Sequence, residues 1–140
     1  MTASSTALGL TLPASIAAAL AAHAHRELPN EACGLLAGDP ATGRVRTFHS
    51  ARNEHASPLR FSVDARDLVR ITYELEAMGQ ALLAIFHSHP RSAAKPSATD
   101  VREARYPDAL HVLSGSQGEL RAWRIRGGYA TEVALSVAAD

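Results

Sequence analysis

One continuous apolar segment, residues 81–86, constrains the fold of this chain more than any other feature. Its six residues, Ala-Leu-Leu-Ala-Ile-Phe, are typical of a strand that is buried on both faces. His87 and His89 follow it directly. Since residues i and i+2 lie on the same face of a strand, we expect the two imidazoles to emerge together at the end of this strand.

A carboxylate follows the two histidines at a short distance. After a loop over residues 90–96, Ser97 starts a predicted helix, in which Asp100 lies three residues on and on the same face. A short loop can fold this turn back over the strand end and add Asp100 to His87 and His89. Three such ligands and an open position are typical of a catalytic zinc site, where the pKa of a bound water falls to about 7. The pattern therefore predicts hydrolysis.

Each part of this pattern also has a structural explanation. Ser97 and Asp100 fit a helix capping box, which is the commoner role of such a pair. The chain contains a second His-x-His pair, His23 and His25, in a predicted helix. Side chains at i and i+2 diverge on a helix, so we expect these two histidines to be solvated. Only the combination at the strand end favours a metal site.

The combined spacing carries a family resemblance. Residues 87–100 fit His-x-His-x7-Ser-x2-Asp without a gap, and the chain therefore resembles the JAMM (MPN-plus) zinc metalloprotease family. The resemblance implies that one Zn²⁺ ion is held by His87, His89 and Asp100. It also implies that Ser97 donates its hydroxyl to the oxyanion formed during attack on a peptide carbonyl.

The same family uses a glutamate near the N-terminus, ahead of a small strand, and Glu31 occupies that place here. By resemblance, Glu31 is the general base that takes a proton from the water and later protonates the leaving amine. Spacing alone instead favours a solvated residue in the turn after the first helix. Glu27 is the nearest rival for the catalytic role.

Further residues resemble a small bacterial branch of the family: Asn53, Ser57, Pro58, Phe61, Asp64, Pro107, Arg121, Ala122 and Trp123. Enzymes of this branch hydrolyse the amide bond after the C-terminal Gly-Gly of a ubiquitin-like or sulfur-carrier protein, and release cysteine or a conjugated protein. Such a carrier is the expected partner, and its tail could bind extended beside a strand edge. The loop over residues 51–60 does not distinguish between the two leaving groups.

Two alternative functions make different demands on the sequence. A zinc deaminase needs a Pro-Cys-x-x-Cys motif, which a chain with the single cysteine Cys33 lacks. A non-catalytic MPN scaffold, or a module that binds ubiquitin-like proteins, would keep the fold but is usually recognised by lost ligands. Here all five candidate site residues are present, which favours the enzyme, and the non-catalytic module is kept as the alternative.

Composition bounds the remaining possibilities. With 140 residues, 46% hydrophobic and 20% charged, the chain is expected to be a single globular domain over residues 1–140, with residues 1–10 as a loose tail. Lys and Arg number fourteen, as do Asp and Glu, and no basic stripe suggests nucleic-acid binding. The sequence leaves the oligomeric state open, with a homodimer as one possibility.

The expected location is cytoplasmic. The lone Cys33 fits a reducing compartment and is expected to be a buried structural thiol. The alanine-rich stretch over residues 10–24 could imitate a signal peptide, but no Lys or Arg precedes it. Instead, Thr11 is expected to cap a helix that contains Pro13 in its first turn and extends to Glu27.

The remaining elements predict an α/β fold with a mixed β-sheet flanked by helices. A second helix is capped by Asp64, ends at Gly79 and buries a stripe of Leu68, Ile71, Leu75 and Met78. Strands are expected over residues 32–37, 44–50, 110–113, 120–125 and 129–137, with His111 as a satisfied structural residue. The resemblance implies a JAMM/MPN domain related in shape to cytidine deaminases.

Overall fold

The computed structural model describes residues 9–140, so the predicted tail lies mostly outside the described residues. None of the helices within this range is long and apolar enough to span a membrane. The elements in chain order are β1 (Leu10–Pro13), α1 (Ala14–Glu27), β2 (Cys33–Asp39), β3 (Arg44–Ala51), α2 (Ala65–Met78), β4 (Ala81–Ser88), α3 (Ala98–Glu103), β5 (Leu110–Ser114), β6 (Leu120–Arg126), β7 (Tyr129–Val133) and β8 (Leu135–Ala138).

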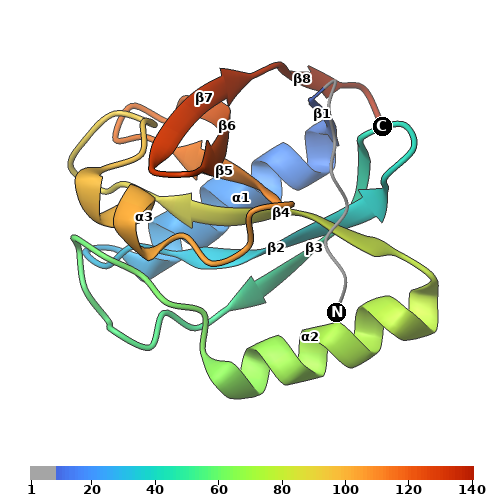
Figure 1. Ribbon diagram of the computed structural model, residues 1–140, viewed down its shortest axis with the longest axis horizontal. Helices are drawn as coiled ribbons and strands as arrows, with labels where there is room; N and C mark the ends of the chain where they lie inside the picture. The colour runs from blue at the N-terminus through green and yellow to red at the C-terminus, as the bar shows by residue number, and fades with distance from the viewer. Residues whose placement is uncertain (1–8) are drawn as a thin grey trace.

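The strands form one mixed sheet in the order β7-β6-β5-β4-β2-β3-β1-β8. β4 pairs in parallel with β5 and antiparallel with β2, which places the apolar segment inside the sheet. β1 is parallel to both of its neighbours, and the other pairs are antiparallel. The predicted α/β architecture with a mixed sheet and flanking helices is therefore confirmed (Figure 1).

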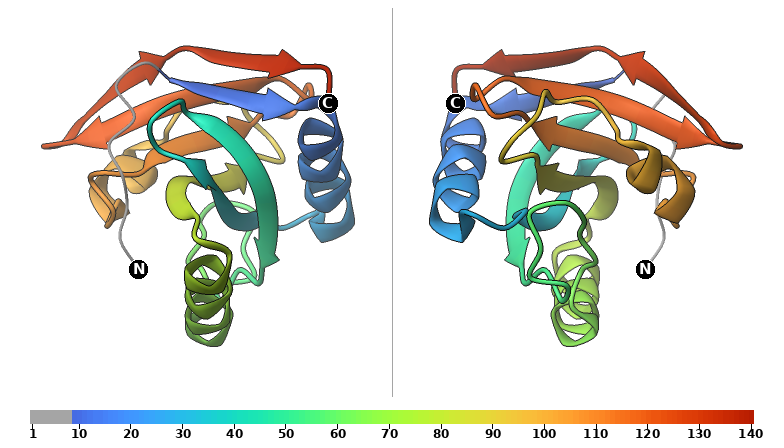
Figure 2. Two further views of the ribbon diagram at one scale, coloured as in Figure 1. Left: turned by 90° about the vertical axis from the view of Figure 1, so that its right-hand side faces the viewer. Right: turned by 90° about the vertical axis from the view of Figure 1, so that its left-hand side faces the viewer.

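Helices cover both faces of the sheet, with α1 on one side and α2 on the other (Figure 2). The alternation of side chains along β4 explains why both are needed: Phe86 packs in the cluster that contains Leu20 of α1. Ile85, which faces the other way, packs with Ile71 of α2. Each such buried side chain contributes about 1.5–3 kcal/mol. The prediction of a strand buried on both faces is confirmed.

The ends of α2 follow the predicted signals. The side chain of Asp64 accepts hydrogen bonds from the backbone amides of Arg66 and Asp67, at 3.0 and 3.1 Å. Gly79 ends the helix in the left-handed region with φ 66°, which glycine adopts without strain. The prediction of a buried stripe is wrong for its last member, because Met78 is 46% exposed.

Two elements differ from the sequence-based expectation. Thr11 does not cap a helix but lies in β1, and α1 begins at Ala14 after Pro13. The strand expected over residues 129–137 is interrupted at Ala134, whose carbonyl accepts a hydrogen bond from Leu10 N at 3.0 Å. The break allows β8 to pair with β1 across more than a hundred residues, which no local pattern indicates.

Candidate metal centre

The end of β4 fixes the two histidines. Strand pairing places His87 between Cys33 of β2 and Leu113 of β5. The next residue, Ser88, is tied to β2 through Ala32, whose amide donates to the serine hydroxyl at 2.8 Å. The amide of His89 donates to the Ser114 carbonyl at 2.7 Å. Both imidazoles are thus held on a rigid scaffold, and both are buried.

The first turn of α3 brings Asp100 to these imidazoles. Asp100 Oδ2 lies 3.2 Å from His87 Nε2 and 2.9 Å from His89 Nε2. The same oxygen accepts from Ser97 N at 2.9 Å, while Ser97 Oγ accepts from Asp100 N at 3.0 Å. The capping box is therefore present, and it orients the carboxylate toward the histidines instead of competing with that contact.

Glu31 reaches the same point from the segment before β2. Its amide donates to the Ser57 carbonyl at 2.8 Å, and its carbonyl accepts from Asn53 Nδ2 at 3.1 Å. Both partners belong to the polar loop after β3, so this loop positions Glu31. The side chain is 2% exposed, and Oε1 has no hydrogen-bond partner among the described residues.

Four of the five predicted site residues meet at one place. The nearest ligand atoms of Glu31, His87, His89 and Asp100 all lie within 4.8 Å of one another, and all four residues are buried. Ser97 adjoins this cluster through Asp100. Glu27, the rival of Glu31, does not belong to the cluster.

Burial and mutual charge set the protonation of this cluster. Burial, helped by the charge of Asp100, raises the pKa of Glu31 to about 8. Burial alone would raise the pKa of Asp100 too, but hydrogen bonds from His87 and His89 outweigh it and lower that pKa, so Asp100 is a carboxylate. Burial lowers the pKa of His87. For His89, the bonds to Asp100 and to the Ala93 carbonyl exceed the effect of burial and raise the pKa.

The donor set fits a divalent metal ion. Two imidazole nitrogens and one carboxylate oxygen converge, which suits zinc and also iron or manganese. His89 Nδ1 lies 2.8 Å from the Ala93 carbonyl, so its Nε2 is the nitrogen that faces the cluster. The buried, unpartnered Glu31 Oε1 is a polar atom that still needs a hydrogen-bonding group beside it.

An aromatic ring closes one side of the cluster. Phe61 stacks on His87 with ring centroids 4.2 Å apart and planes inclined by 18°. It follows the polar loop that also holds Glu31, so one segment supports two members of the site. Sequence reasoning linked Phe61 to the family but did not place it at the metal centre, because only the fold brings it to His87.

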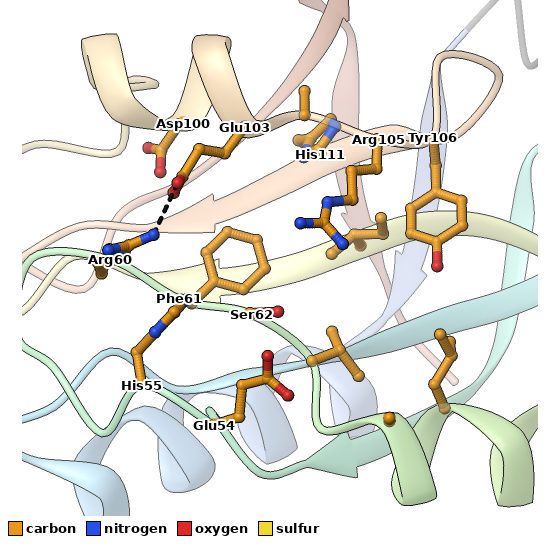
Figure 3. A pocket seen from close by; sticks show the side chains of 15 residues that line it. Glu54, His55, Arg60, Phe61, Ser62, Asp100, Glu103, Arg105, Tyr106 and His111 are labelled. Carbon is orange, nitrogen blue, oxygen red and sulfur yellow. Dashed lines mark hydrogen bonds and ion pairs between the residues drawn. The ribbon is translucent and has the colours of Figure 1, made fainter.

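A pocket of about 320 Å³ adjoins the metal centre (Figure 3). Phe61 and Asp100 line both the pocket and the cluster, and the pocket extends past Arg105 and Tyr106. His111 also lines it, and the prediction of a satisfied histidine is wrong. This residue is 3% exposed, and its ring nitrogens have no hydrogen-bond partner in the described part of the chain. Burial lowers its pKa to about 4, so the ring is neutral at pH 7.

Two other sequence-based expectations concern residues near the site. Cys33 is a free, buried thiol, as predicted, and burial raises its pKa to about 12. The expectation for His23 is wrong, because this residue is buried and its Nε2 lies 2.9 Å from the Cys33 carbonyl. Its place seven residues after Ile16 and three after Leu20, in the buried stripe of α1, is a sequence signal that could have indicated burial.

A comparison with known families identifies the family of the chain. A family profile described as "Prokaryotic homologs of the JAB domain" matches residues 13–126, a range that contains all five predicted site residues. The chain belongs to this family. The resemblance to the JAMM family is therefore confirmed.

Several known proteins are similar to this chain along most of its length. The CysO-cysteine peptidase of Mycobacterium tuberculosis is 35% identical over 132 residues, covering 91% of this chain and 90% of that protein. The probable TtuB-protein conjugate cleaving protease of Thermus thermophilus is 39% identical over 131 residues, covering 93% and 84%. A solved structure, DSY2949 from Desulfitobacterium hafniense, is 30% identical with a TM-score of 0.86, covering 94% of each chain.

Proposed function

We propose that this protein is a zinc-dependent peptidase that hydrolyses the amide bond after the C-terminal Gly-Gly of a ubiquitin-like or sulfur-carrier protein. The convergence of Glu31, His87, His89 and Asp100 carries the proposal. The names of the two relatives support the substrate class, because one is a peptidase for a cysteine adduct and the other cleaves protein conjugates. The leaving group is accordingly cysteine or a conjugated protein.

In this proposal His87, His89 and Asp100 hold the zinc ion, which supplies Lewis-acid activation of a water molecule. Glu31 accepts the proton of that water and later gives it to the nitrogen of the leaving amine. Burial raises the pKa of this carboxyl above its usual range, so Glu31 can hold the proton between the two steps.

Ser97 has a second role in the proposed reaction. Its Oγ accepts a hydrogen bond from the Asp100 amide, which leaves the hydroxyl O–H free to donate a hydrogen bond of its own. We propose that this hydroxyl donates a hydrogen bond to the oxyanion that forms when the carbonyl of the last glycine is attacked. Capping and oxyanion stabilisation use different parts of the hydroxyl, so one serine can perform both.

The shape of the site supports a tail of glycines as substrate. Glu31, His87 and His89 are each no more than 5% exposed, so the reacting carbonyl must approach closely. Glycine allows such an approach because it has no Cβ. The pocket beside Phe61 and Asp100 is where we place the preceding residues of the carrier tail.

The proposal treats residues 1–140 as one catalytic domain in a reducing, cytoplasmic compartment. The free thiol of Cys33 supports such a compartment. The open alternative, a non-catalytic scaffold or a module that binds ubiquitin-like proteins, would not need a buried glutamate beside three converging ligand atoms.

The experiment is cleavage followed by intact-mass analysis. The zinc-loaded protein is incubated with two carriers that end in Gly-Gly, one extended by cysteine and one joined through an isopeptide bond to a lysine. We expect at least one to yield a carrier that ends at the second glycine. Binding of both carriers without cleavage of either would instead establish the binding-module alternative, and Glu31→Gln serves as the matched inactive variant.

A further inference from the structure

We propose that Trp123 and Glu119 are positioning residues for the metal ligand His89, acting through the loop over residues 90–96. The inference rests on the proposed metal site. Neither residue touches the cluster of Glu31, His87, His89 and Asp100. Both instead hold Ala94, which is the neighbour of the residue that orients His89.

The loop contacts His89 through a single carbonyl. His89 Nδ1 lies 2.8 Å from the Ala93 carbonyl. This contact decides which ring nitrogen faces the other ligands, and such partners of ligating histidines tune metal affinity. The position of the Ala93 carbonyl therefore matters for metal binding, although Ala93 itself offers only backbone.

The β5–β6 hairpin holds both backbone groups of Ala94. Trp123 Nε1 donates to the Ala94 carbonyl at 2.9 Å in a buried contact. Glu119 Oε2 accepts from the Ala94 amide at 3.2 Å. On the other side of Ala93, the Ser92 carbonyl accepts from Ser116 N at 2.8 Å. The Ala93 carbonyl is thus fixed by neighbours on both sides.

The tryptophan itself is held in place. Ala94 is fully buried and packs with Leu113 and Trp123 in a small core cluster. The guanidinium carbon of Arg121 lies 4.7 Å from the centre of the indole, and Arg121 is held by two hydrogen bonds of 2.8 Å to Glu132. The indole N–H therefore has a fixed direction, toward the loop.

A loop of seven residues that contains two prolines and no helix or strand needs such an external anchor. In the metal-free protein, loss of the anchor lets the Ala93 carbonyl move away from His89 Nδ1. The imidazole can then rotate or change its tautomer, and the preformed ligand geometry is lost. Metal affinity is expected to fall before the fold is lost.

The test is the dissociation constant for zinc, measured by competition with a chromophoric chelator. Trp123→Phe removes the indole donor and keeps an aromatic ring. Ile125→Val, on the same face of the same strand, is the matched control for a change in packing. We expect zinc affinity to fall about 10–100-fold in Trp123→Phe and to stay within twofold of wild type in Ile125→Val.

Glu119 provides a second test that leaves the core intact. Glu119→Ala is expected to weaken zinc binding about 10-fold, whereas Glu119→Gln, which keeps an acceptor oxygen, restores most of the affinity. The visible absorption of the cobalt-substituted protein should shift in Trp123→Phe, as expected for altered ligand orientation. Equal zinc affinity and unchanged cobalt spectra in wild type, Trp123→Phe and Glu119→Ala would overturn the inference.

The wild-type protein and His89→Ala separate this inference from the proposed function. If wild type binds zinc no more tightly than His89→Ala, the metal site itself is wrong. If wild type binds zinc tightly and Trp123→Phe does so equally, only the positioning role is wrong.

Discussion

Phe61 stacks on the imidazole of His87, with ring centroids 4.2 Å apart. We expect Phe61→Ala to uncover His87 and admit water to the site, which lowers kcat/KM about 10-fold through less precise ligand geometry. Because Phe61 is only partly buried, the substitution should lower the free energy of unfolding by about 1–2 kcal/mol. Replacing a fully buried phenylalanine would cost about 3–5 kcal/mol. Phe61→Leu should keep most of the cover. Equal kinetics for the alanine and wild-type proteins would contradict the role of the stacked ring.

Replacing Glu31 by glutamine separates catalysis from metal binding. We expect Glu31→Gln to lower kcat by about 10²–10⁴-fold, the usual contribution of a general base, while zinc still binds with near wild-type affinity. Metal analysis and steady-state kinetics on the same preparation check this. A loss of zinc in Glu31→Gln would mean that Glu31 is a ligand and not the base.

The raised pKa of Glu31 also predicts a pH effect on the metal-free protein. The folded pKa of about 8 exceeds the unfolded value of about 4.5, so the contribution of Glu31 to stability is full below pH 4.5 and is lost as pH rises to 8. The free energy of unfolding should fall by at most about 1.4 kcal/mol per pH unit in this range. Urea unfolding at several pH values should show this decline in wild type and not in Glu31→Gln.

Ser97 can be tested for its two roles with two substitutions. Ser97→Ala should destabilise the protein by about 1 kcal/mol, whereas Ser97→Gly should destabilise it by only a few tenths, because glycine is tolerated at an N-cap. Both lack the hydroxyl, so both should lower kcat by about 10²–10³-fold. If Ser97→Gly kept full activity, the serine would be a cap only.

His111 should make the protein sensitive to acid. Its folded pKa of about 4 lies below its unfolded value of about 6.5, so its contribution to stability is full above pH 6.5 and is lost as pH falls to 4. His111→Leu removes a buried ring with unpartnered nitrogens and should flatten this part of the stability curve without a loss at pH 7. An unchanged curve would show that His111 is hydrogen-bonded in solution.

Local patterns predicted those parts of the molecule that depend on neighbours in sequence. The apolar run before His87 indicated the central strand, and the Ser97 and Asp100 spacing indicated the helix start. The two segments can meet because only a short loop connects them. The role of Glu31 came from the family resemblance alone, because its position at the cluster depends on the loop that contains Asn53 and Ser57.

The features that the sequence did not predict are set by distant contacts. The pairing of β8 with β1 and the anchoring of Ala94 by Trp123 join residues that are far apart in the chain. Met78 fits the helical period but is exposed, which periodicity cannot reveal. Binary patterns report which face is apolar, but not which partner covers it.

The most direct test of the zinc-peptidase assignment is a titration of the metal-free protein with zinc, followed by cleavage of a carrier that ends in Gly-Gly-Cys or in a Gly-Gly isopeptide bond. We predict that the rate of cleavage rises linearly up to one equivalent of zinc per chain and then stays constant. His87→Ala should remain inactive at every zinc concentration. Cleavage by the metal-free protein, or equal cleavage by His87→Ala, would contradict the assignment of the metal centre.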